Sequence, residues 1–141
     1  PIGVVMVLST NIEMFRDISG SHFNPAVTLG NFIRGSIGLI NASLYVMAQL
    51  LGAISATAIA YRFTMQTFGM HLEDMFYVLP NAQAHTDIVL GGEFLFTFLL
   101  VLVMLYVTSH KASEHRNSLV GLSVASVVGS GGYALGNITG A

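Results

Sequence analysis

Residues 35–61 contain no charged side chain, and this long stretch limits the kind of fold that the chain can adopt. A helix that crosses a bilayer needs about 20 mostly apolar residues, so the stretch is long enough to span a membrane. The composition agrees, because 53% of all residues are hydrophobic and only 9% are charged. Soluble domains carry about 25% charged residues. We therefore predict an all-α, polytopic membrane protein.

Two further segments qualify as spans, residues 88–109 and residues 117–136, and residues 1–12 are typical of the end of an earlier span. The only charge in these two spans is the carboxylate of Glu93. Residues 62–87 are polar and are expected to form a loop. We expect a single transmembrane domain over residues 1–141 that is a fragment of a longer chain.

The basic residues indicate which side of the membrane each loop faces. If every span crosses, the residues on one side include Arg16, Arg34, Lys111 and Arg116, whereas the other side has only Arg62. Cytoplasmic loops are enriched in Lys and Arg. The loop of residues 62–87 is therefore predicted to lie outside.

Charge and cysteine content exclude several functions. The net charge of −2 offers no basic surface for nucleic acid, and the absence of Cys excludes a thiolate metal site. The sequence contains no glycine-rich phosphate loop, nucleophile elbow or carboxylate pair. We expect no catalysis, no cofactor and no metal site.

The segment from Ile18 to Thr28 interrupts the membrane pattern with a glycine and then Asn24-Pro25. Asn is among the best helix N-caps, and Pro fits the first helical position because its missing N–H costs nothing there. The helix expected over about residues 24–34 is too short to cross. Irregular backbone inside a membrane is tolerated only where it is buried in protein or lines a water-filled cavity. The pattern therefore predicts a re-entrant half-helix at a pore.

The residues before that half-helix recur at the other end of the chain. Asp17-Ile18-Ser19-Gly20-Ser21 and Asn137-Ile138-Thr139-Gly140-Ala141 share one pattern of residue types. An odd number of spans separates the two copies, so they face the membrane from opposite sides. Such an inverted repeat places the functional site near the midplane. We expect a second Asn-Pro two residues beyond Ala141.

Small residues recur at every fourth position in two of the expected spans. One stripe is Ala48, Gly52, Ala56 and Ala60, and the other is Gly121, Ala125 and Gly129. Small residues let helices approach closely in lipid, where burial of apolar surface gives no drive to associate. We interpret both stripes as packing surfaces without chemistry.

These features resemble the aquaporin, or major intrinsic protein, family. Residues 19–28 match its first Asn-Pro-Ala signature. Further matches are Tyr45, Ala48-Gln49, Gly52-Ala53, Glu93-Phe94, Thr97-Phe98 and Thr139-Gly140-Ala141. The resemblance covers the whole chain, from the second to the fifth span of a six-span fold. It implies a right-handed helical bundle with inverted repeats and re-entrant half-helices, assembled as a homotetramer in the plasma membrane.

The resemblance also implies a passive pore for water, with glycerol or urea left open as further permeants. The implied pore-lining residues are Gly20, Ser21, His22 and Phe23, and the signature at the pore centre is Asn24, Pro25 and Ala26. Backbone carbonyls of the unwound segment would accept hydrogen bonds from water, and the half-helix N-terminus, with about half a positive charge, would oppose protons and cations. The competing interpretation is that Asn24 only caps a helix.

Glu93 and Gln49 are implied to support the re-entrant segment. The resemblance suggests that Glu93 accepts hydrogen bonds from backbone N–H groups of re-entrant segments. An ionisable residue within a span is a functional candidate by default. Proton transfer is the alternative role for Glu93, although no carboxylate or His partner at helical spacing supports a relay.

The resemblance implies that selectivity depends on a constriction near the outer mouth, and the implied constriction residues are Val4, Gly132 and Ala141. Water-selective family members have a His nine residues before the position of Ala141, and this chain has Gly132 there. Ungapped spacing from Asn24 places Val4 on the opposite wall, whereas alignment by Gly3 places Ile2 there. Small and aliphatic residues at both positions resemble glycerol-conducting members. The alternative role for Gly132 is close helix packing or a kink.

Two other functions remain as alternatives. A structural or junctional membrane protein could use the same fold for contact through the loop of residues 62–87, and an ion-conducting relative could share the whole architecture. Water flux and electrical conductance distinguish these alternatives from a water channel.

Overall fold

The computed structural model describes residues 2–69, 81, 83–109 and 119–140. Its helices in these ranges are α1 (Ile2–Ser19), α2 (Pro25–Ile33), α3 (Leu39–Phe68), α4 (Thr86–Val107) and α6 (Val120–Thr139), and the same ranges contain no strand. Two of the helices, α3 over Leu39–Thr67 and α4, are long and apolar enough to cross a membrane. The all-helical membrane fold predicted from the sequence is confirmed.

The third predicted span is present as a helix, but it is less apolar than expected. Helix α6 has 20 residues, which is long enough to cross. Within the described ranges, however, only α3 and α4 are both long enough and apolar enough to cross a membrane. The glycine and serine residues of α6 make this helix less apolar than α3 and α4. These small residues allow close packing against the neighbouring helices.

Two helices extend beyond the spans predicted for them. Helix α1 continues beyond residue 12 to Ser19, and α3 continues through Arg62 to Phe68. Charged side chains do not stop a helix, because Arg and Glu are nearly as good helix formers as Leu. Helix α3 ends instead at Gly69, which has the left-handed φ of +61° typical of a glycine after a helix. The first residues of the predicted outside loop, 62–68, are therefore helical, and its residues 70–80 lie outside the described residues.

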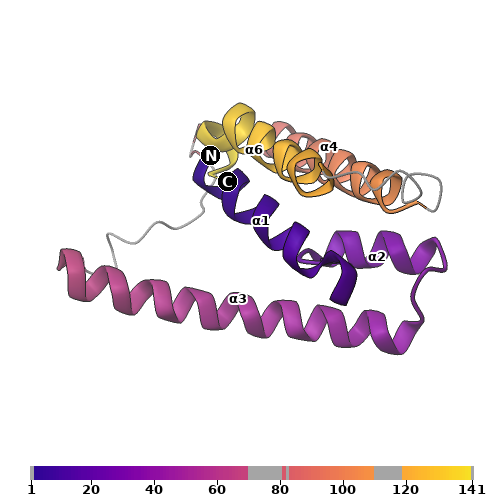
Figure 1. Cartoon of the computed structure of the whole chain (residues 1–141). Coiled ribbons are helices and arrows are strands. Elements are labelled where there is room, and N and C mark those ends of the chain that lie inside the picture. Colours follow the sequence, from indigo (N-terminus) through magenta and orange to yellow (C-terminus); the bar gives the residue numbers. More distant parts are fainter. Residues whose placement is uncertain (1, 70–80, 82, 110–118, 141) are drawn as a thin grey trace.

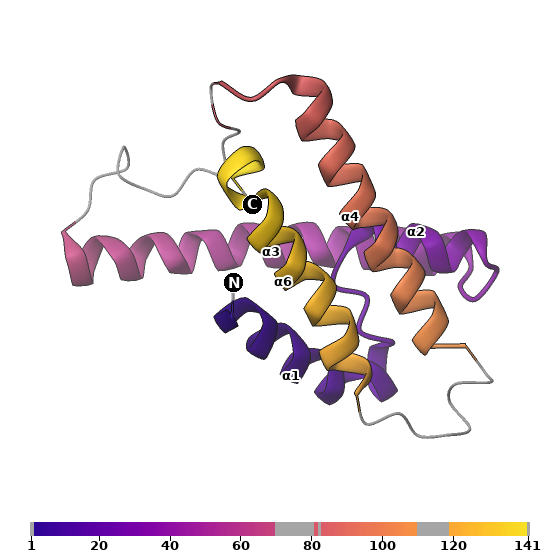
Figure 2. The same ribbon diagram turned by 90° about the horizontal axis from the view of Figure 1, so that it is seen from above.

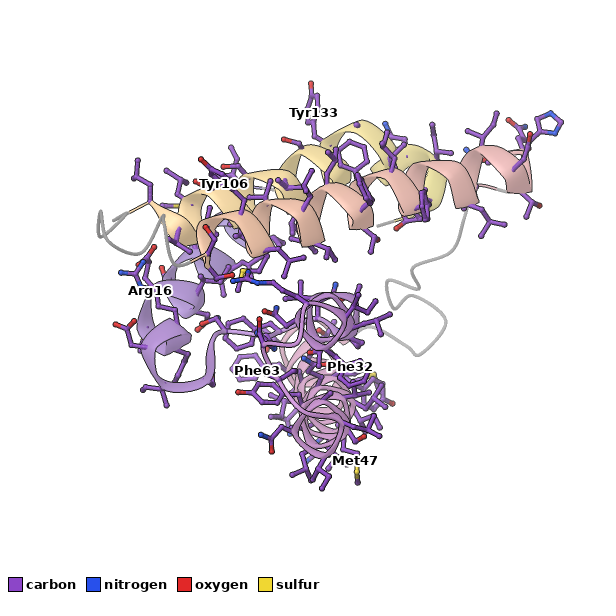
Figure 3. The ribbon with its side chains drawn as sticks, turned by 90° about the vertical axis from the view of Figure 1, so that its right-hand side faces the viewer. Arg16, Phe32, Met47, Phe63, Tyr106 and Tyr133 are labelled. Atoms are coloured by element: carbon purple, nitrogen blue, oxygen red, sulfur yellow. The ribbon has the colours of Figure 1, made fainter. Side chains whose placement is uncertain are left out.

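The helices lie at three levels, with α4 and α6 at one side, α1 and α2 next to them, and α3 beyond α2 (Figure 1). Helices α4 and α6 lie side by side, α1 packs against α6, and α2 packs against α4 on the same side (Figure 1). Helix α3 packs along α2, and its Tyr45 side chain also reaches Ser19 at the end of α1. Figure 2 shows α3 crossing beneath α6 and α4. Most of α3 thus presents apolar side chains outward, including Met47 (Figure 3).

The buried core lies where α1, α2, α4 and α6 meet. Its members are Ile12, Val27, Met104, Val107, Val120 and Val124. Gly30 of α2 allows close approach to α4, since a Cβ atom there would lie 2.6 Å from Val101 Cγ1. This core fixes the end of α1 and the body of α2, and so it positions the segment that connects them.

One predicted small-residue stripe is a packing surface in the structure, and the other is not. A Cβ atom on Gly121 would collide with the Ser9 carbonyl oxygen, and one on Gly129 would collide with Val5. Between them, Ala125 has no exposed surface. By contrast, a Cβ atom on Gly52 of α3 would meet nothing within 4 Å in the described structure. The α6 stripe therefore forms the seam with α1.

We expect Gly121→Ala to destabilise the protein by about 1–3 kcal/mol, the usual cost of overpacking against atoms that cannot move aside. The obstructing atom is a backbone oxygen of α1, so relief would require the two helices to separate. Gly52→Ala is the matched control, and it should be neutral or stabilising by up to about 1 kcal/mol, because Ala favours helix more than Gly does. Thermal unfolding in detergent measures both. Equal shifts in the melting temperatures of the two variants would contradict the proposed close packing of α6 against α1.

The glycines of the two copies of the sequence repeat end their helices in the same way. Gly20 follows α1 with φ +68°, and its N–H donates to the Arg16 carbonyl at 2.9 Å. Gly140 follows α6 with φ +82°, and its N–H donates to the Gly136 carbonyl at 3.0 Å. Helices α1 and α6 are antiparallel, because Glu13 lies near Gly121 and Val5 lies near Gly129. The copies therefore end two oppositely directed helices, as an inverted repeat requires.

Candidate functional site

The tip of α2 is built as its sequence predicts. Asn24 has extended backbone angles, φ −140° and ψ 132°, and its Oδ1 accepts the N–H of Ala26 at 2.7 Å. Pro25 occupies the first helical position. Because Oδ1 is used for capping, the Nδ2 amide is left for another partner, and no acceptor in the described ranges takes it. Asn24 is half-buried.

Helix α3 holds the connection between α1 and α2. The Tyr45 hydroxyl donates to the Ser19 carbonyl at 2.7 Å. One turn later, Gln49 Nε2 donates to the His22 carbonyl and, at 2.9 Å, to Thr28 Oγ1. The predicted supporting role of Gln49 therefore corresponds to two observed contacts, one on each side of Asn24.

Two carbonyl groups of this connection remain available as acceptors. The carbonyls of Ser19 and His22 are taken by α3, and the Ser21 carbonyl accepts the N–H of Phe23 at 3.0 Å. No donor among the described residues reaches the carbonyl oxygens of Gly20 or Phe23. A main-chain carbonyl without a protein partner can accept a hydrogen bond from water, so these two are candidate binding points for water.

The side chain of His22 is buried in the described structure. It is only 9% exposed, and its ring centroid lies 5.1 Å from that of Tyr45. Its Nδ1 has no hydrogen-bond partner in the described structure. His22 is also absent from the walls of the cavity at Asn24. The described structure therefore offers no support for its predicted pore-lining role.

Asn24 opens into a cavity of about 160 Å³ between the re-entrant tip, α4 and α6. Glu93 and Thr97 of α4 and Gly132 of α6 also line it. Glu93 is exposed there, and it accepts no hydrogen bond from the described residues. Its predicted role as an acceptor for re-entrant N–H groups stays a prediction.

Two of the three residues predicted for the constriction line the same cavity. Val4 of α1 and Gly132 of α6 both line a cavity of about 770 Å³ beside the glycine row of α6. Ile2, the alternative to Val4, does not line this cavity and is 77% exposed. Tyr133, the residue after Gly132, also lines this cavity, and its side chain points outward from the helices (Figure 3). Ala141, the remaining constriction residue, lies outside the described residues.

The sequence did not reveal two contacts that join distant helices. Glu13 Oε1 accepts the N–H of Gly121 at 2.7 Å, so a carboxylate on α1 caps the start of α6. Arg34, just after α2, donates through Nη1 to the Leu105 carbonyl at 2.8 Å near the end of α4. Each is charge-complementary to the helix end it meets. No local sequence pattern indicates either pairing.

Comparison with known proteins gives consistent matches. Residues 2–141 match the family model described as Major intrinsic protein. Aquaporin FA-CHIP of Pelophylax lessonae is 36% identical over 123 residues, which cover 84% of this chain and 43% of that protein. Aquaporin-1 of Homo sapiens is 36% identical over 123 residues, 84% of this chain and 44% of that protein. The neurogenic protein big brain of Drosophila melanogaster is 32% identical over 120 residues, which cover 85% of this chain and 17% of that protein. The chain thus spans less than half the length of these relatives.

Proposed function

The chain belongs to the major intrinsic protein family, and from this premise we propose that the protein is a passive channel that conducts water across a membrane. A passive pore performs no chemical step, so the proposal includes neither catalysis nor a cofactor. The relatives named aquaporins support water as the permeant. The most direct support in the structure is the placement of Asn24 at the N-terminus of a short helix that opens into a cavity.

The electrostatics of that tip suit a pore for neutral molecules. The N-terminus of a helix carries about half a positive charge, concentrated on N–H groups that have no partner in the helix. A positive end that faces a narrow passage opposes cations and protons, while water passes. Asn24 Nδ2 can donate to a water oxygen as its Oδ1 caps the helix. The exclusion of ions is part of the proposal.

The carbonyls of Gly20 and Phe23 supply the complementary acceptors. A water molecule that donates to a carbonyl and accepts from Asn24 has its orientation fixed at the tip. Fixed orientation interrupts the hydrogen-bonded chain along which protons would move. This arrangement provides donors and acceptors without any charged side chain from residues 20–24.

Osmotic swelling of vesicles that contain the full-length protein tests the proposal. We expect rapid water flux together with no cation conductance in planar bilayers. Folded protein without water flux would favour the structural or junctional alternative. Cation conductance that accompanies or replaces water flux would favour the ion-conducting alternative.

We propose that glycerol is a second permeant and that four subunits assemble in the plasma membrane. Val4 and Gly132 give the larger cavity a small, apolar wall, which leaves room for the carbon chain of a polyol. The assembly and the location are supported by family membership alone. Cross-linking in detergent tests the number of subunits.

We expect Gly132→His to reduce glycerol flux about tenfold or more and to leave most of the water flux, since pore diameter and lining donors set permeant size and polarity. The imidazole would occupy space in the cavity that glycine leaves open. Ser130→His is the matched control, because Ser130 is exposed on the same helix and does not line this cavity. Parallel swelling assays with water and glycerol measure the ratio. An unchanged ratio would remove Gly132 from the selectivity site.

A further inference from the structure

The chain turns between α1 and α2 through two consecutive left-handed residues. Gly20 has φ +68° and Ser21 has φ +52°. Ser21 is the only residue other than glycine with a positive φ in the described ranges. Non-glycine residues adopt this conformation at a cost, and it persists only where surrounding contacts enforce it. The structure should therefore contain a contact that holds Ser21.

That contact comes from the Ser21 side chain. Its hydroxyl donates to the Ile12 carbonyl at 2.9 Å, nine residues back on α1. Ser21 is 3% exposed and Ile12 is 1% exposed, so the bond is shielded from water. A carbonyl oxygen has two lone pairs, so it can accept this hydroxyl in addition to a helical N–H. The turn is thereby tied to a residue of the buried core.

The connection is thus anchored to two different helices. Tyr45 and Gln49 tie it to α3 through the carbonyls of Ser19 and His22, and Ser21 ties it to α1. Along the segment, the bond at Ser19 goes to α3, the bond at Ser21 goes to α1, and the bond at His22 goes to α3 again. A segment held at Ser19, Ser21 and His22 has little freedom to rotate its peptide planes.

We propose that Ser21 is a positioning residue for permeation, which acts through the backbone and not as part of the pore wall. Its hydroxyl holds the backbone turn at residues 20–21 in place. The carbonyls of Gly20 and Phe23 thereby remain free to accept hydrogen bonds from water. This inference rests on the proposed water channel. It also revises the predicted pore-lining role of Ser21, whose side chain is buried and already bonded.

Two variants of the full-length protein separate the hydroxyl from the backbone conformation. Ser21→Ala removes the donor and keeps a side chain at positive φ, whereas Ser21→Gly removes the donor and relieves the conformational cost. We expect both to lower water permeability per folded channel by about threefold to tenfold, the factor that corresponds to one lost hydrogen bond. We also expect both to raise the activation energy of water flux. Stopped-flow swelling of phosphatidylcholine vesicles measures both quantities.

Ser55→Ala is the matched control, because Ser55 donates the same kind of bond to the Leu51 carbonyl at 2.8 Å on the exposed side of α3. It should conduct like the wild type. Normal flux in Ser21→Gly with loss in Ser21→Ala would overturn the hydroxyl role in favour of backbone conformation alone. Losses that only follow the amount of folded protein would show a structural role and also overturn it. Wild-type protein without water flux would overturn the proposed function itself, whereas wild-type flux with unaltered Ser21 variants would overturn this inference alone.

Discussion

Replacement of Asn24 with Asp is expected to lower water flux about tenfold, the effect of losing one strong hydrogen bond, and to admit cations. Asp and Asn are equally good N-caps, and a carboxylate at a helix N-terminus is favourable, so α2 should keep its stability. The substitution removes the Nδ2 donor and adds a negative charge where the helix end opposes cations. Swelling assays measure the water flux, and recordings in planar bilayers measure the cation conductance. Thermal unfolding measures the stability.

Asn24→Asp preserves the helix cap but replaces the amide donor in the cavity with a negative charge. The variant therefore distinguishes a role of Asn24 in the pore from a role in capping alone. Asn41→Asp is the matched control, since Asn41 is exposed in the first turn of α3 and undergoes the same change of charge. It should leave both flux and conductance unchanged. If Asn24→Asp also behaves like the wild type in both assays, Asn24 is only a helix cap, and the proposed route of permeation is wrong.

The helices were predictable because membrane spans and caps are local properties of the sequence. The long apolar stretches located α3 and α4, and Asn24-Pro25 located the start of α2. The errors arose where charge was taken as a helix end. Helix α3 continues through Arg62 until Gly69, where a left-handed glycine is the physical stop. That glycine was visible in the sequence, so it would have been the better boundary.

The candidate site was predictable only in part, because its supports connect residues that are far apart in sequence. The bond from Ala26 to Asn24 spans two residues, and the sequence indicates it directly. The bond from Gln49 to His22 spans 27 residues, and the bond from Gly121 to Glu13 spans 108. Such pairs depend on helix packing, which no local pattern encodes. For Gln49 the resemblance to a family supplied what the residue pattern could not.

The choice between Val4 and Ile2 shows the same limit. Both are aliphatic residues two positions apart, and sequence spacing alone left them as alternatives. On a helix, residues two apart face different directions. The seam between α1 and α6 fixes the rotation of α1, and this rotation places Val4 in the wall of the cavity that Gly132 also lines.

Replacement of Gln49 with Leu is expected to lower the free energy of unfolding by about 1–3 kcal/mol, the cost of leaving a buried polar group without its partner. The His22 carbonyl would lose its donor, because Gln49 Nε2 is what binds it. The segment before Asn24 would then lose one of its anchors to α3, and water flux per folded channel should fall as well. Gln66→Leu is the control, since Gln66 is exposed on the same helix. Thermal unfolding and swelling assays measure the two effects.

Thr28→Val shows whether these contacts act as one network. Thr28 Oγ1 accepts from Gln49 and donates to the Asn24 carbonyl at 3.3 Å, so it joins the support on α3 to the tip of α2. Thr28→Val alone should cost less than Gln49→Leu, because the His22 carbonyl keeps its donor. In the double variant the losses should overlap, with a coupling energy of about 0.5–3 kcal/mol, as residues in one hydrogen-bond network show. Strictly additive losses would mean that Gln49 supports the connection and the helix tip independently, and that α3 does not set their relative position.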